Sequence, residues 1–302
     1  MIHAIPPNNA INADSKKWRD EGAPLFAAGY GERSAANQDE PYQRVVAASA
    51  FSKPEPTHTD FVVYSRAIAG APVRGEAVAN PIRVVVEIGP KGKKVAAVAV
   101  DWPGLERGAK TEEAALERLR AYIPRYAPIT KLAKMDVAFA TAAAITVVEQ
   151  YRGTGSTDFW GISFAFSSID NQGLSSEALE RELTLMRACW TFFDDVRSRV
   201  SPEMRKGPRG GGRDRDQIVR HTLAVEQDWA RGLGLPAPED VMLSDEALKV
   251  YRDAYCNAIR RFHSEGKLAG KWPLRYLIRH TAFHTLDHAW EMEDKDLTNK
   301  EA

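Results

Sequence analysis

The C-terminal half of the chain carries the clearest periodic pattern of hydrophobic and polar positions. In its first segment, apolar residues recur three and four positions apart, as on one face of an amphipathic helix: Leu179, Leu183, Met186, Cys189, Trp190 and Phe193. Together with capping and stop residues, such patterns predict four helices, over about residues 175–200, 214–231, 244–265 and 273–293. Helices of this length joined by loops are typical of an antiparallel four-helix bundle.

A different pattern precedes these helices. Residues 83–88 and 94–101 are rich in β-branched and small apolar side chains, and they flank the turn sequence Gly89-Pro90-Lys91-Gly92. This arrangement predicts a β-hairpin.

A helix is expected next, from the N-cap Thr111 to about residue 122, with Pro124 and Pro128 closing it. Two strand-like runs follow, over residues 144–151 and 157–166. The order of hairpin, helix and strands predicts a small α+β domain.

The predicted fold class is therefore α+β with two domains, a small β-hairpin/α domain followed by an antiparallel four-helix bundle. We expect a poorly ordered leader over residues 1–75, where asparagine, proline, glycine and charged residues leave little periodicity. The small domain is placed at residues 76–170, the bundle at 171–296 and a tail at 297–302.

Composition limits the class of function. Among 302 residues, Lys+Arg and Asp+Glu both number 41, so no global charge attracts nucleic acid or an anionic membrane. The sequence contains no apolar run long enough to span a bilayer and no recognisable secretory signal, and a cytoplasmic location is expected. Cys189 and Cys256 lie in helical patterns among apolar neighbours and are expected to be buried free thiols.

Three of the seven histidines, His280, His284 and His288, fall four residues apart in the last predicted helix. Each step of four turns a helix by about 400°, so neighbouring members differ by only about 40° in direction. Because neutral imidazole is the commonest metal ligand in proteins, this spacing favours a metal site.

A fourth histidine, His221, lies on or beside the apolar stripe of the second predicted helix, between Ile218 and Val225. Bundle interiors assemble metal sites from facing helices, so His221, His284 and His288 are the predicted ligands. Three protein ligands leave a position open, as in catalytic sites. The alternative is that these histidines are exposed or are hydrogen-bonded core residues.

His280 can replace His288 as a ligand or serve as an acid–base group at the mouth of the site. Asp287 and Glu291 flank the histidine pair and are further catalytic candidates, and either of them or Asp228 can orient a ligand. For each carboxylate the alternative is a solvated charge.

The loop from Lys206 to Asp216 is rich in glycine and arginine and leads into a helix N-terminus. Arg209, Gly211 and Arg213 are therefore candidates for an anion or cofactor-carboxylate clamp, the alternative being a flexible loop.

The histidine pattern supports a family resemblance. Residues 174–294 resemble the DinB-like superfamily of four-helix bundles, which is related to mycothiol-dependent maleylpyruvate isomerases and bacillithiol transferases. The match rests on His221 and on the run His284-Thr-Leu-Asp-His288. The resemblance implies that these three histidines hold one divalent metal. After the pair, this chain has Ala289-Trp290-Glu291 where many members have Arg-Gly-Gln.

Residues 83–126 resemble the HicB-like domain, the antitoxin partner in toxin–antitoxin pairs. The hairpin, Asp101-Trp-Pro-Gly104 and the run from Gly108 to Leu116 carry this likeness. It implies an interaction domain that binds a protein partner or a second copy of the chain. No separate DNA-binding helix pair follows it.

Two functions are consistent with the sequence. The first is a metal-dependent enzyme that uses zinc, nickel or iron, and a low-molecular-weight thiol as a further candidate cofactor, to act on a small molecule by thiol transfer or hydrolysis. The second is a non-catalytic binding or scaffold protein with a structural metal or none. Neither nucleic acid nor membrane is an expected partner.

Overall fold

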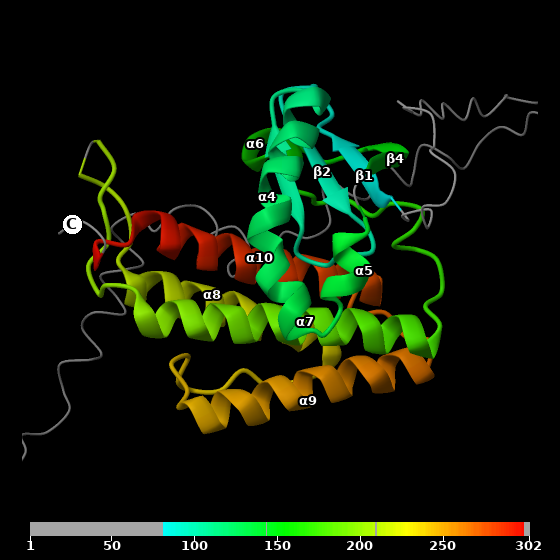
Figure 1. Cartoon of the computed structure of the whole chain (residues 1–302). Coiled ribbons are helices and arrows are strands. Elements are labelled where there is room, and N and C mark those ends of the chain that lie inside the picture. The colour runs from blue at the N-terminus through cyan, green and yellow to red at the C-terminus, as the bar shows by residue number, and fades with distance from the viewer. Residues whose placement is uncertain (1–80, 143, 209, 299–302) are drawn as a thin grey trace, which may run out of the picture. The chain divides into compact units, whose positions relative to one another are not determined.

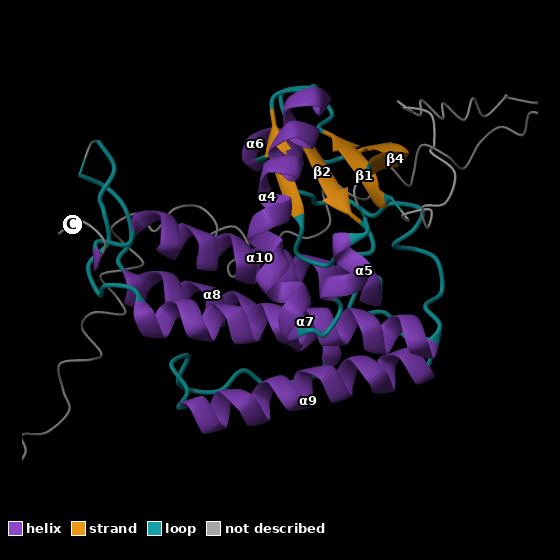
Figure 2. Ribbon diagram, in the orientation of Figure 1, coloured by secondary structure: helices purple, strands orange, loops and turns teal. Residues whose placement is uncertain are grey.

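The computed structural model describes residues 81–142, 144–208 and 210–298, all within one compact unit that runs from Tyr64 to Ala302. The predicted leader at 1–75 lies outside these residues. The described chain is mixed α+β, with a small sheet followed by a helical C-terminal region (Figures 1 and 2).

The sheet has four strands in the order β3-β2-β1-β4. The strands are β1 (Ile82–Ile88), β2 (Val95–Ala99), β3 (Glu106–Ala109) and β4 (Ile145–Arg152). β1 pairs antiparallel with β2 and parallel with β4, and β2 pairs antiparallel with β3. The predicted hairpin and the strand over 144–151 are confirmed, whereas β3 was not predicted.

Helix α4 (Glu112–Leu132) begins at the predicted N-cap, where Thr111 Oγ1 accepts a hydrogen bond from the Ala114 N–H. The prediction that Pro124 and Pro128 end the helix is wrong, because both lie inside it. Both prolines are exposed, so water can bind the carbonyls whose helical hydrogen bonds they remove.

The predicted strand over 157–166 is also wrong. Its first residues belong to helix α6 (Gly155–Trp160), which follows the short helix α5 (Asp136–Ala140) and β4. Thr154 and Thr157 form a capping box that begins α6, and Gly161 ends it in the left-handed conformation at φ 74°. These local signals outweigh the β-branched and aromatic composition of the run.

Four long helices form the C-terminal region: α7 (Ser176–Arg199), α8 (Arg215–Ala230), α9 (Asp245–Ser264) and α10 (Leu274–Lys295). The short 3₁₀ helix η1 (Arg231–Leu233) follows α8 directly. All four agree with the predicted helices to within two residues at each end. Ser175 and Ser244 are the N-caps of α7 and α9, and their side chains accept hydrogen bonds from the backbone N–H groups of Ala178 and Ala247.

The main hydrophobic core is continuous from the sheet through α4 into the four long helices. Cys189 and Cys256 are buried free thiols in this core, as predicted. α10 lies beside both α7 and α8 and is buried along most of its length (Figure 1). Burial on several sides fixes the rotation of α10, and therefore the direction in which its histidines point.

A buried polar network joins α10 to the sheet side of the chain. The Arg279 guanidinium donates to both carboxylate oxygens of Asp170, at 2.7 and 2.8 Å. Glu106 on β3 and Glu87 on β1 are buried in the same region, and Ser163 donates from its hydroxyl to Glu87 and from its backbone N–H to Glu106. These contacts set the position of α10 against the sheet.

Among the described helices, none has both the length and the apolar character that crossing a bilayer requires.

Candidate metal centre

His221, His284 and His288 meet between α8 and α10. One ring nitrogen from each lies within 4.8 Å of the corresponding nitrogens of the other two. The ring centroids are 5.2 Å apart for His221 and His284, and 5.0 Å for His221 and His288. Residues more than sixty positions apart are thus brought into one group.

The helical spacing on α10 creates half of this arrangement. His284 and His288 are one turn apart, and their ring centroids lie 4.5 Å from each other. Both are buried, with 7% and 8% of their surface exposed, whereas His221 is half-buried at the edge of the stripe that α8 packs inward. The group is therefore open on the α8 side.

The surroundings keep two of the imidazoles neutral. Burial, reinforced by the nearby His288 and Arg213, lowers the pKa of His221 to about 3. Burial and the neighbouring histidines also lower the pKa of His284 well below its usual value. A neutral imidazole has a free lone pair, which is the form that binds a metal ion.

Glu291 fixes the orientation of the third ring. His288 Nδ1 lies 2.7 Å from Glu291 Oε2. Burial alone would raise the pKa of the Glu291 carboxyl, but hydrogen bonds from His288 and Lys295 and the charge of Arg213 lower it to about 2. As a carboxylate can only accept, Nδ1 is the donor, and Nε2 is the nitrogen left for a ligand bond.

The glycine-rich loop contributes one arginine to this region. Arg213 Nη2 lies 3.7 Å from Glu291 Oε2. Gly211 takes part in a turn of the loop itself, where its carbonyl accepts a hydrogen bond from Gly207. Arg209 lies outside the described residues. Of the two clamp residues that the structure describes, Gly211 and Arg213, it is Arg213 that lies beside the histidines.

His280 does not belong to the three-histidine group. It is buried among aromatic rings, stacked on Tyr276 at 5.0 Å and tilted against Trp229 at 4.8 Å. Burial lowers the pKa of His280 to about 3. Its place one turn before His284 puts it against the aromatic side chains, away from His221.

The remaining predicted carboxylates have other partners. Asp287 is half-exposed and pairs with Arg107 of β3 at 3.3 Å, and Asp228 pairs with Arg231 at 3.1 Å. Sequence reasoning missed Lys295, which donates to Glu291 Oε1 at 2.5 Å. The spacing of four residues between Glu291 and Lys295 is a signal that could have revealed this pair.

No family model, no curated protein and no solved structure matches this chain. The assignment of a chemical role therefore rests on the side chains themselves.

The donor set fits a divalent transition-metal ion. Three imidazoles from two helices supply nitrogen ligands of the kind that zinc, nickel and iron accept. One ring is held by an anionic carboxylate through its other nitrogen, an arrangement common among metal-ligating histidines. Three ligands leave coordination positions for a water molecule or a substrate atom.

Proposed function

We propose that the chain is a divalent-metal-dependent enzyme that acts on a small molecule by thiol transfer or hydrolysis. In this proposal α7, α8, α9 and α10 form a DinB-like four-helix bundle, and the preceding sheet with α4 forms a separate HicB-like domain. The observation that carries the proposal is the convergence of His221 with His284 and His288.

The three histidines hold the ion, which when bound lowers the pKa of a coordinated water or thiol and polarises a carbonyl group. Glu291 keeps the His288 proton on Nδ1 and so keeps Nε2 directed to the ion. Arg213 places a positive charge next to this carboxylate, where it can bind an anionic group of the substrate or thiol.

The open side of the site decides what can approach. His221 is half-buried and Arg213 is 27% exposed in its side chain, so a ligand can approach along the α8 side. The Trp229 ring, which also belongs to α8, lies 5.3 Å from the His284 ring and provides an apolar wall. These features favour a small substrate with an anionic end and an apolar part.

Metal analysis of the full chain, prepared without a histidine tag, tests the proposal. We expect about one zinc, nickel or iron ion per chain in the wild type and a loss of that ion in His284→Ala. The matched control is His263→Ala, because His263 on α9 bonds to the Leu174 carbonyl and lies outside the three-histidine group. A wild type that stays metal-free after supplementation contradicts the proposal.

A metal-loaded wild type must then be assayed for activity. Hydrolysis of ester and amide substrates, and transfer of small thiols to electrophiles, distinguish the two reaction classes. Absence of both activities in the loaded protein, with retained metal, would favour a scaffold with a structural ion.

A further inference from the structure

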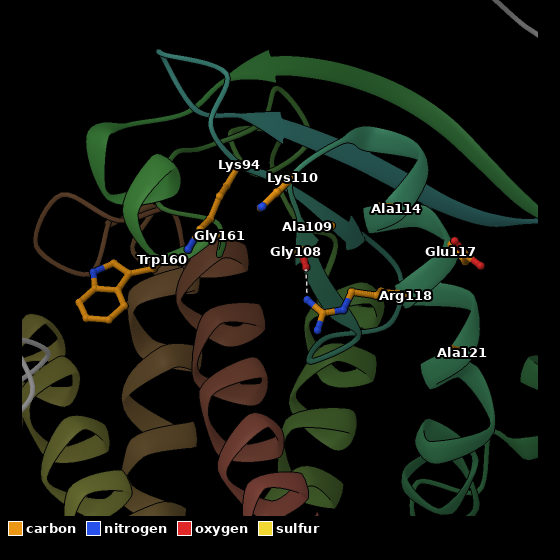
Figure 3. A pocket seen from close by; sticks show the side chains of 10 residues that line it. All are labelled: Lys94, Gly108, Ala109, Lys110, Ala114, Glu117, Arg118, Ala121, Trp160 and Gly161. Atoms are coloured by element: carbon orange, nitrogen blue, oxygen red, sulfur yellow. Dashed lines mark hydrogen bonds between the residues drawn. The ribbon is translucent and has the colours of Figure 1, made fainter. Parts of the chain in front are cut away.

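A pocket lies on the sheet side of the chain, between β3, the first half of α4 and the end of α6 (Figure 3). Its volume is about 560 Å³, and none of its lining residues belongs to the three-histidine group. We refer to it as the β3–α4 pocket. Any role that it has is separate from the candidate metal centre.

The backbones of β3 and of the end of α6 are in contact at two glycines, Gly108 and Gly161. A Cβ atom on Gly108 would lie only 1.7 Å from the Gly161 carbonyl oxygen, so any side chain at this position would displace the backbone. Gly161 also adopts the left-handed conformation that ends α6. This close approach of the two backbones brings the side chains of β3, α4 and α6 around one shared space.

Three cationic side chains line that space: Lys94, Lys110 and Arg118. Lys94 Nζ donates to the Phe159 carbonyl at 2.6 Å, and Arg118 Nη1 donates to the Gly108 carbonyl at 2.8 Å. These bonds hold two of the cations at the walls of the pocket, where Figure 3 shows them facing the space between α4 and α6. Both groups keep further N–H donors for a ligand.

The positive charge of the β3–α4 pocket is not neutralised locally. Within the described part of the chain, no carboxylate forms an ion pair with Lys94, Lys110 or Arg118. The one acid of the lining, Glu117, points away from the three cations (Figure 3). Three cations and one acid leave a formal charge of 3 − 1 = +2.

We propose that the β3–α4 pocket binds the phosphate group of a small phosphorylated molecule. A phosphomonoester carries a charge of about −1.5 to −2 near neutral pH, which matches the pocket, and it offers three acceptor oxygens to the three cationic groups. The guanidinium of Arg118 suits such an oxyanion geometrically. The volume of the pocket exceeds that of a phosphate group, which leaves room for the rest of a small molecule.

Titration of the full chain with glycerol phosphate at constant ionic strength, followed by calorimetry, tests this inference. Wild type should bind in a saturable manner, and unphosphorylated glycerol should not bind. Inorganic phosphate in place of the ester shows whether the phosphate group alone is sufficient for the interaction that we propose. Absence of saturable binding by either phosphate compound overturns the inference.

Matched variants locate the site. Lys110→Ala and Arg118→Ala should each weaken binding by about ten-fold, as expected for one lost charge-assisted contact. Both residues are exposed, and Lys110 has no hydrogen bond within the described chain, so its replacement leaves folding intact. Arg120→Ala removes a charge from the same helix outside the pocket and should leave the affinity unchanged. Equal weakening by Arg120→Ala would indicate non-specific charge attraction and contradict the inference.

Discussion

The hydrogen bond between His288 and Glu291 gives the candidate centre its directionality. Imidazole has two similar nitrogens, and the carboxylate decides which one carries the proton. The spacing of three residues along α10 makes this contact possible, whereas Asp287, one residue before His288, is drawn to Arg107 instead. At the scale of single residues, Glu291 is therefore the side chain that orients the site.

Replacing Glu291 with glutamine tests this role. Glutamine can still accept a hydrogen bond at its amide oxygen, but it lacks the negative charge that strengthens the bond from His288. We expect Glu291→Gln to weaken metal affinity by about 10- to 100-fold without abolishing it. Competition with a chelator of known affinity measures the change.

Glu293→Gln is the matched control on the same helix, because Glu293 pairs with Arg125 and Arg199 rather than with a histidine. Unchanged affinity in Glu291→Gln, or an equal loss in Glu293→Gln, would show that Glu291 does not orient the ligand.

At the scale of elements, the four long helices were predictable because their hydrophobic spacing and N-caps agree with each other. β3 was not, because Glu106-Arg107-Gly108-Ala109 shows no apolar alternation and is held as a strand by pairing with β2. The buried Leu119 and Tyr126 show how tertiary packing extends α4 through two prolines. Local pattern fails where the partner strand or the core decides the structure.

The candidate site, too, could be predicted from the sequence only in part. The helical period predicts that His284 lies beside both His280 and His288, and it cannot choose between them. The position of α8 determines which histidine joins His284 in the group, because His221 approaches His284 and His288 while Trp229 lies against His280. Similarly, the partner of Asp287 comes from the strand that the sequence did not predict.

The docking of α10 on the sheet side depends on the buried pair of Arg279 and Asp170. Asp170→Asn leaves the Arg279 guanidinium buried beside a neutral group, and we expect a loss of about 3–5 kcal/mol in the free energy of unfolding. Urea denaturation measures this loss. Asp101→Asn, which breaks the exposed pair with Arg83, should cost less than about 1 kcal/mol. Similar losses in the two variants would contradict the importance of the buried pair.

At the scale of the whole molecule, the region between sheet and α10 contains more buried acid than buried base. Glu87, Glu106 and Asp170 are all buried there, whereas the buried guanidinium groups nearby are those of Arg279 and Arg107. Burial raises the pKa of Glu106 from 4.5 to about 7, with Arg279 opposing the shift. The folded chain therefore keeps a proton on Glu106 that the unfolded chain releases.

This shift predicts how stability depends on pH. Between about pH 4.5 and 7 the folded state binds more protons at Glu106 than the unfolded state does, so this residue lowers stability as pH rises through that window. Below the window the carboxyl is protonated in both states, and above it the loss is complete. Glu106→Gln removes this contribution.

Urea denaturation of wild type and Glu106→Gln across the same pH range isolates the effect. The stability of the variant relative to wild type should increase from pH 4.5 to 7 and then level off. A constant difference across the range would show that folding does not shift the pKa of Glu106.

The central claim is that His221 completes a ligand set with two histidines from another helix, and cobalt(II) binding tests it most directly. Titration of the metal-free full chain should give a visible absorption band that saturates at about one cobalt ion per chain, since d–d spectra report the ligands around the ion. His221→Ala should lose or shift this band, while His263→Ala retains it. An identical band in wild type and His221→Ala, or no band in the wild type, would contradict the account.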